Sequence, residues 1–506
     1  MRSILSLSKT NKLILATFAF LAVLAFGSGR ANAATLNVTG GCTLPIAIDS
    51  VNAGANQSGC TATGAGYGTS DTINIPAGTQ TLTADMPVIT ENIVINGAGM
   101  SQTIIDGDNG QYNGIEIGTG ISATISNLKV IAYSGYAILS NTDETLNINN
   151  IEVDGSDALP SSGEFEAIFL QSLSSGTRTV NLSDIYVHDI VGSANVVGAL
   201  LINQGQGGVS NVSLQNITIA NISNTTSGGG TIGVMLSVGL WDNVFGGFGT
   251  LNANAANITI DNVYSTTTIA APFSNNAYSN NGDALVNTII NNVTVTGTDG
   301  TLDPTGLAAS AAFYAASLGV GAGTTATSTI SVGNSLLANN KSNGVSNNCA
   351  VGDFTALASG LGTGVVSVNS LGHNIFDDNS CAGSFTSPTD QHNVSNVYST
   401  LGPLQDNGGA VPTRALLPGS PAISAGGSVL GVTTDARGIA RPNACPSVGA
   451  FQFEGAVCGA STPSTSGSGN AGAPNTGANS VSLVGSLFAS FAGLLTLGYV
   501  FARKRA

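Results

Sequence analysis

The stretch Ile125-Ser126-Asn127-Leu128-Lys129-Val130 decides the fold, because its pattern of apolar-x-Asn-apolar-x-apolar returns along the middle of the chain. Within each copy, apolar and polar residues alternate, which is typical of a strand with one buried face and one wet face. Further copies begin at Ile148, Leu182, Leu214, Ile260 and Ile290, and a looser copy spans 330–336. A short pattern that returns many times predicts a stacked repeat architecture.

The asparagine of each copy lies where the alternation shifts by one residue, so the backbone must bend there. Asparagine tolerates the left-handed conformation that such a bend needs, and its amide can hydrogen-bond to the equivalent residue of the next coil. Asp184 holds this position in one copy. The sequence therefore predicts a parallel β-helix with an asparagine ladder. Less polar strands are expected between the copies, at 137–139, 167–170, 199–202, 232–236, 284–286 and 312–313.

The regions that flank the copies differ from them in character. Residues 34–90 precede the first regular strand, and we expect them to cap the first coil, whose edge would otherwise be unpaired. The coils are expected over 91–345. A Pro- and Gly-rich region, 346–458, follows where the asparagine pattern fades, and we expect it to cover the other end.

The composition describes the surface of this fold. The 506 residues include 67 glycines but only 8 % charged and 6 % aromatic residues, with 42 % hydrophobic residues. A disordered chain would be poorer in hydrophobic residues and richer in charge. Asn, Ser, Thr and Gly must therefore cover much of the surface, as suits an extracellular stacked β fold.

Both ends of the chain carry targeting signals. Residues 1–33 combine a basic start, an apolar run and the sequence Ala31-Asn32-Ala33, which predicts a secretory signal peptide cleaved after Ala33. A permanent membrane helix is the alternative, although the apolar run is short for a span. At the other end, we expect a flexible linker over 459–480, a transmembrane helix over 481–502 and a basic cytoplasmic tail over 503–506.

The net charge limits the choice of partners. The formal value is −15, and the two end segments contain seven basic residues and no acid. The displayed portion therefore keeps six basic residues against 28 acids, a net charge near −22. Such a surface repels nucleic acid and anionic lipid.

Six cysteines in an exported chain favour disulfides. A zinc site is the alternative, which the lack of any CxxC pair disfavours. Six cysteines allow fifteen pairings, and proximity in the sequence predicts local ones. The predicted pairs are Cys42 with Cys60, Cys349 with Cys381, and Cys445 with Cys458.

Two segments resemble regions of bacterial surface proteins. Cys42-Thr-Leu-Pro-Ile-Ala-Ile48, followed by Cys60, resembles the CSLREA-type start, with Pro45-Ile46 in place of Arg-Glu. Proteins of this type are right-handed β-helices displayed by varied anchoring devices, mostly without known catalytic activity. The resemblance implies a right-handed parallel β-helix with N- and C-terminal caps. A second resemblance, to the choice-of-anchor Q region, rests on Leu401–Gly409, Leu416–Ile423, Asp435-Ala-Arg-Gly438, Arg441-Pro442 and Val448–Phe451.

The tail resembles a sortase substrate. The residues Ala473-Pro474-Asn475-Thr476-Gly477 precede the apolar segment and the basic tail, with Ala473 in place of the usual Leu. In that family a thiol transpeptidase attacks the Thr carbonyl. The resemblance therefore implies that Thr476 is joined to an amine of the cell-wall peptidoglycan and that Gly477 onward is discarded. A plain membrane anchor is the alternative.

Parallel β-helices also include polysaccharide enzymes, which need clustered carboxylates as acid and base, or calcium. The candidate catalytic residues are Asp184, His188 and Asp189, with Asp154, Asp157, Glu164 and Glu166 nearby in the sequence. A structural role is the alternative, because Asp184 holds a ladder position and His188-Asp189 follows a strand. Calcium is the one cofactor that the sequence suggests, and its candidate ligands are Asp106 and Asp108.

These features predict a non-enzymatic cell-surface display protein, acting as an adhesin or as a wall-layer structural or binding component. Its expected partners are sortase, peptidoglycan, and a glycan or a surface ligand on a host or neighbouring cell, but not nucleic acid. The alternative function is that of a wall-anchored β-helix polysaccharide lyase or hydrolase.

Overall fold

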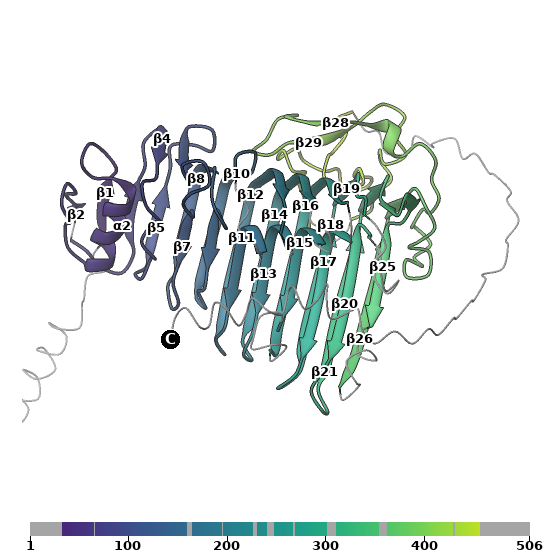
Figure 1. Cartoon of the computed structure of the whole chain (residues 1–506). Helices are drawn as coiled ribbons and strands as arrows, with labels where there is room; N and C mark the ends of the chain where they lie inside the picture. Colours follow the sequence, from purple (N-terminus) through teal and green to yellow (C-terminus); the bar gives the residue numbers. More distant parts are fainter. Residues whose placement is uncertain are drawn as a thin grey trace, which may run out of the picture.

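The computed structural model describes residues 33–455, except 65, 159–163, 195, 226–229, 240–246, 267–268, 301–309, 354–361 and 429–430. The described chain is almost entirely β, and its parallel strands stack coil upon coil in a solenoid-like arrangement (Figure 1). The prediction of an all-β fold of stacked parallel strands is therefore confirmed.

The larger sheet contains the strands that carry the asparagine pattern. Each strand pairs in parallel with its equivalent in the next coil. Its main strands, in order along the stack, are β1 (Ala34–Asn37), β3 (Asp71–Asn74), β5 (Ile93–Asn96), β8 (Ala123–Ile131), β10 (Thr145–Asp154), β12 (Thr177–Gly192), β14 (Val209–Asn224), β16 (Gly249–Ser265), β18 (Ala284–Asn291), β21 (Thr325–Gly333) and β26 (Thr363–Gly372). Its other parallel strands are β4 (Gly78–Thr81), β6 (Thr103–Asp106), β19 (Thr294–Thr296), β22 (Leu336–Ala338) and β27 (Ile375–Phe376). The short strand β2 (Thr63–Gly64) pairs with β1 in the antiparallel direction.

The second sheet faces the first across the interior and contains the less polar strands. All of its pairings are parallel, and its strands are β7 (Ile115–Ile117), β9 (Ile138–Ser140), β11 (Glu164–Ser172), β13 (Val196–Gln204), β15 (Gly230–Val238), β17 (Ala270–Ser279), β20 (Phe313–Gly319) and β25 (Cys349–Asp353). Between the sheets lies one continuous core, made mostly of Ile, Val, Leu and Ala from every coil. No single coil could bury its own apolar face, so stacking provides the stability.

One strand of the predicted pattern belongs elsewhere. Residues 284–286 were expected among the less polar strands, but they begin β18 of the larger sheet, and β17 takes the expected place in the second sheet. The coils also continue past residue 345, because β25, β26 and β27 pair in parallel with the preceding coil.

The N-terminal region carries the helix α2 (Leu44–Ala53), which the sequence analysis did not predict. Pro45 stands in the first turn, and Gly54 ends the helix in a left-handed conformation at φ 61°. Leu44, Ala47 and Ile48 are buried against the first coils. Cys42 is bonded to Cys60 beside the helix, as predicted.

The C-terminal region has two parts: Cys381 and Phe385 pack into the main core beside the last coil, whereas the chain from Tyr398 onward lies along the side of the coils (Figure 1). Its hairpin of β28 (Leu401–Gln405) and β29 (Thr413–Leu416) follows a 3-10 turn at Tyr398–Thr400. Thr218 on β14 donates a hydrogen bond of 2.7 Å to the carbonyl of Pro412. Arg414 forms an ion pair of 2.9 Å with Asp261 on β16. A smaller hairpin of β23 (Lys341–Ser342) and β24 (Val345–Ser346) precedes this region.

Several predictions of the sequence analysis concern residues that the structure does not describe. Cys349 is bonded to Cys381 as predicted, whereas the pair of Cys445 with Cys458 involves a residue outside the described range. The signal sequence up to residue 32, the sorting motif 473–477 and the apolar segment 481–502 also lie outside it. Within the described part of the chain, no helix is long and apolar enough to cross a membrane.

Candidate functional site

Left-handed bends divide the long strands of the larger sheet into separate outward faces. Asn127, Asn150, Asp184, Asn216 and Asn257 all have φ between 54° and 61°, and they stack in successive coils. The amide of Asn150 donates to Asn127 Oδ1 at 2.6 Å, and that of Asn216 donates to Asp184 Oδ1 at 3.0 Å. The predicted asparagine ladder is confirmed, with Asp184 as one of its members.

A second ladder lies five residues farther along the strands. Asp189, Asn221 and Asn262 also have positive φ, and each amide donates to the residue of the preceding coil at 2.7 and 2.9 Å. The sequence analysis placed Asn262 in the first ladder. The structure corrects this, because Asn257 holds the first-ladder position and donates to Asn216 Oδ1. Both Asp184 and Asp189 are therefore bend residues.

The outward residues before the first bend form a surface of amides and hydroxyls, which we call the neutral face. It belongs to β8, β10, β12, β14 and β16, and no outward side chain of these described strands is ionisable before the bend. Arg178 of β12 points inward and is 1 % exposed. The neutral face comprises Thr124, Ser126, Thr145, Asn147, Asn149, Thr177, Thr179, Asn181, Ser183, Val209, Asn211, Ser213, Gln215, Thr250, Asn252, Asn254 and Ala256.

A groove of about 370 Å³ lies over β8, β10 and β12, on the neutral face and up to the bend residue Asp184 at its edge. Its side chains are preoriented by hydrogen bonds between coils. Asn181 Nδ2 donates to Asn147 Oδ1 at 2.9 Å, and Asn147 Nδ2 donates to Thr124 Oγ1 at 3.4 Å. Each amide carries two N–H donors and two acceptor lone pairs, so these bonds leave further polar capacity for a ligand. The groove is lined by Thr124, Asn147, Ile148, Asn149, Asn181, Ser183 and Asp184.

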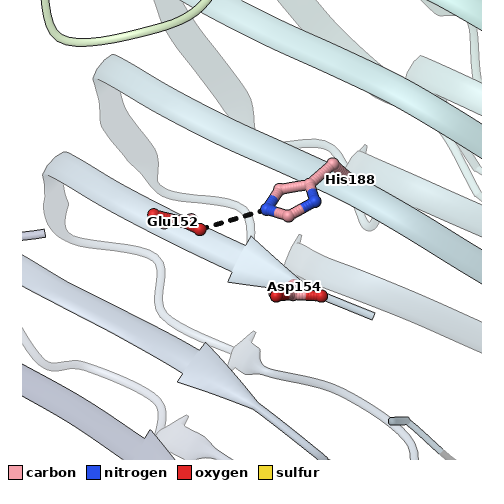
Figure 2. Close-up of side chains that lie close together, drawn as sticks. All are labelled: Glu152, Asp154 and His188. Carbon is pink, nitrogen blue, oxygen red and sulfur yellow. Dashed lines mark hydrogen bonds and ion pairs between the residues drawn. The ribbon is translucent and has the colours of Figure 1, made fainter. Parts of the chain in front are cut away.

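Beyond the first bend the same strands carry charges, on a surface that we call the charged strip: Lys129, Glu152, Asp154, Tyr186 and His188. Lys129 Nζ lies 2.8 Å from Glu152 Oε1 and 2.8 Å from Asp154 Oδ2. His188 Nε2 lies 3.1 Å from the same Glu152 oxygen, and Figure 2 shows the ring aimed at that carboxylate. Its ring stacks on Tyr186, with centroids 4.1 Å apart.

The pKa values of the charged strip follow from this mutual pairing. Burial lowers the pKa of His188, but hydrogen bonds to Glu152 and to Asp189, the latter 2.7 Å away, outweigh it and raise the pKa above its ordinary value. Burial opposes ionisation of Asp154 as well, yet the bond from Lys129 and those from Ser156 lower its pKa to about 2. The pKa of Glu152 is also lowered, because His188 and Lys129 outweigh the effect of burial. Both carboxyl groups are therefore ionised at neutral pH.

Glu152, Asp154 and His188 also have the composition of a metal site. Their ligand atoms lie within 4.8 Å of one another, and the described residues contain no other such group of three. The Lys129 ammonium already contacts both carboxylates. A metal ion would have to displace it, so the geometry favours an ion-pair network over metal binding.

The remaining predicted site residues are dispersed. Asp106 Oδ1 accepts a bond of 2.9 Å from the Asp108 amide, and the Asp108 carboxylate accepts from Asn109 and Gln111, so both aspartates serve a turn. Asp157 is exposed in another turn. Glu166 lies on β11 of the second sheet, 6 % exposed, and burial raises its pKa to about 8. The side chain of Glu164 is outside the described set.

The sequence analysis missed Lys129 and Glu152 as partners. Each residue stands two places after the ladder asparagine of its own copy, and the copies are stacked in register, so that Lys129 pairs with Glu152 and Glu152 with Tyr186. Aligning the copies on their asparagines would have revealed this pairing. The neutral face could also have been predicted, because its strands carry no outward charge before the ladder residue.

No protein-family model, curated protein or solved structure matches this chain.

Proposed function

We propose that this chain is a right-handed parallel β-helix displayed at the cell surface, where it binds neutral glycans through the neutral face. One observation carries the proposal. In a chain whose net charge is −15, five neighbouring strands present only amide, hydroxyl and small apolar side chains before the bend. A surface that must only remain soluble has no need to exclude charge from one face.

Amides and hydroxyls suit the chemistry of sugars. A sugar hydroxyl both donates and accepts hydrogen bonds, and Asn, Ser and Thr offer both functions side by side. The groove places Asn147 and Asn181 beside each other with rotamers already fixed by their mutual bond. Such preorganisation reduces the entropy lost on binding.

Display at the surface is the second part of the proposal. The resemblance of 473–477 to a sorting motif, the apolar segment 481–502 and the basic end support anchoring to peptidoglycan by a sortase. Two disulfides in the described chain suit an oxidising, extracellular setting. The long stack of coils would then serve as an adhesin that holds its neutral face away from the cell.

The charged strip favours this binding function over a polysaccharide hydrolase. A glycosidase needs one carboxylic acid that is protonated at neutral pH, and enzymes achieve this by raising its pKa. In the charged strip, the pKa values of Glu152 and Asp154 are both lowered, and Lys129 bridges the two groups. The strip is therefore better suited to stabilising the coils.

The test is binding of the full chain to insoluble glucan, mannan and chitin, compared with anionic polygalacturonate. We expect retention on at least one neutral polymer and none on polygalacturonate. The variants Asn147→Asp and Asn181→Asp keep the shape of the groove but add charge, and they should lose most of this retention. Asn343→Asp, at an exposed turn between β23 and β24, is the matched control. Equal retention of wild type and groove variants would refute the proposal.

A further inference from the structure

The groove spans three successive coils. Thr124 lines it from β8, Asn147, Ile148 and Asn149 from β10, and Asn181, Ser183 and Asp184 from β12. Thr124, Asn147 and Asn181 form one row across the coils, because the register pairs each with the next. Neighbouring strands lie about 4.8 Å apart, whereas outward residues along one strand repeat about every 6.7 Å. Equivalent outward side chains therefore repeat more closely across the coils than along a strand.

The neutral face extends beyond the groove both along the strands and across the coils. Along β12, the outward row ends at the left-handed bend of Asp184 on one side and at the strand start, Thr177, on the other. Across the coils, the row of Asn181 continues in register with Ser213 on β14 and Asn254 on β16, both exposed. A long ligand thus meets polar side chains beyond the groove in either direction, Thr179 along β12 and Ser213 across the coils, so the spacing of the side chains decides between the two orientations.

The row across the coils repeats its chemistry at the strand spacing. The side-chain amide of Asn181 donates a hydrogen bond to Asn147 Oδ1, and that of Asn147 donates to Thr124 Oγ1, so in both bonds the donor faces the preceding coil. Over β8, β10 and β12, hydrogen-bonding groups are therefore repeated in one orientation about 4.8 Å apart. A pyranose ring in an extended, β-linked chain advances by a similar distance, so successive sugars would meet equivalent groups.

Resting on the proposed function, we propose that the ligand is an unbranched, extended neutral glycan that lies across the strands, parallel to the stack of coils, in the row of Thr124, Asn147, Asn181 and Ser213. The groove holds its first sugars, and the exposed row beyond β12 receives the following ones. Affinity should consequently grow with chain length, because each added sugar reaches another coil.

Two substitutions separate this orientation from the alternative. Ser213→Arg places a long side chain on the next coil, in the row of Asn181, whereas Thr179→Arg places the same side chain on the same strand as Asn181. Neither residue lines the groove, and both variants carry the same added charge. Thermal unfolding of each full-chain variant, compared with wild type, confirms that the coils are intact.

The measurement is the Kd of the full chain for a series of neutral oligosaccharides, with the glucan, mannan or chitin fragments that wild type retains. We expect wild type to bind long fragments at least about tenfold more tightly than disaccharides, and Ser213→Arg to remove that gain while Thr179→Arg keeps it. A loss confined to Thr179→Arg, equal losses in both variants, or no length dependence would overturn the orientation and leave glycan binding standing. Absence of wild-type binding to every neutral glycan would instead overturn the proposed function.

Discussion

The neutral face and the charged strip lie on the same strands, a few residues apart, and differ completely in chemistry. Asn147 and Asn149 precede the bend of β10, whereas Glu152 and Asp154 follow it. On one side, amides bond to amides between coils, and on the other, Lys129 and His188 neutralise two carboxylates. The ladder fixes the backbone, so the outward side chains of each face can vary independently. The difference indicates that the two surfaces serve different purposes. The charges of the charged strip pair with one another, whereas the neutral face retains hydrogen-bond donors and acceptors for a ligand.

The largest expected effect is a loss of stability of the coils that carry both faces, caused by removing one buried side chain. Arg178 lies beneath the neutral face and donates hydrogen bonds to Ser210 Oγ and to the carbonyls of Thr142, Leu170 and Asn203. Arg178→Leu would leave these buried acceptors without their donor, at a cost of about 3 kcal/mol or more in the free energy of unfolding. Urea unfolding followed by circular dichroism measures this cost. Arg178→Lys should recover part of it, and a wild-type midpoint for Arg178→Leu would contradict the account.

The next effect concerns the boundary between the faces. Asn150 has φ 54°, and its amide donates to Asn127. Asn150→Val should cost about 2 kcal/mol, because a β-branched residue strains the left-handed bend and the ladder bond is lost. Asn150→Gly should cost less, about 1 kcal/mol, since glycine adopts this conformation freely. Equal midpoints for the two variants in urea would show that the bend carries no strain.

A smaller effect is confined to the charged strip. Lys129→Met removes the cation shared by Glu152 and Asp154, and we expect a loss of about 1–2 kcal/mol in the free energy of unfolding. Glycan retention should stay within about twofold of wild type, because the neutral face is untouched. Lys129→Arg is the control that keeps the charge. A strong loss of glycan retention in Lys129→Met would show that the two faces act together.

The smallest effect is a pH dependence of stability. The pKa of His188 is raised in the folded chain, so its contribution is fully present below the unfolded pKa of about 6.5 and is lost as pH rises through the folded value. Asp154, whose folded pKa is about 2, contributes above its unfolded pKa of about 3.9 and loses this contribution as pH falls towards 2. The unfolding midpoint of wild type should therefore fall slightly between pH 6 and pH 8, and that of His188→Asn should fall less. Identical pH profiles for wild type and His188→Asn would show that the ionisation of His188 does not contribute to stability.

The ladder was predictable because it depends on local sequence. A left-handed bend favours asparagine, and a phase shift in the alternation locates it. The one error arose at Ala255-Ala256-Asn257, where alanine replaces the large apolar residue that usually opens the pattern. Because this small residue concealed the copy, the pattern was assigned to Asn262, which belongs to the second ladder. The position of 284–286 was wrong for another reason, because these residues begin the same strand as the copy at Ile290.

The sideways packing of the C-terminal region was not predictable in the same way. Its contacts join residues far apart in the chain, such as Arg414 with Asp261 and Arg441 with Asn257. Nothing in local periodicity indicates such pairs. The charged strip is intermediate, since Lys129, Glu152 and Tyr186 share one position in successive copies, but only the register brings His188 beside Glu152.

The central claim is that the neutral face binds its ligand without ionic contacts. The most direct measurement is the affinity of the full chain for the neutral glycan that it retains, at salt concentrations from about 0.05 M to about 1 M, over which electrostatic attraction is progressively screened. The account predicts an affinity that changes by less than about twofold, and a loss of binding in Asn181→Asp at every concentration. A steep fall in affinity with salt would place the ligand on charged residues and contradict the account.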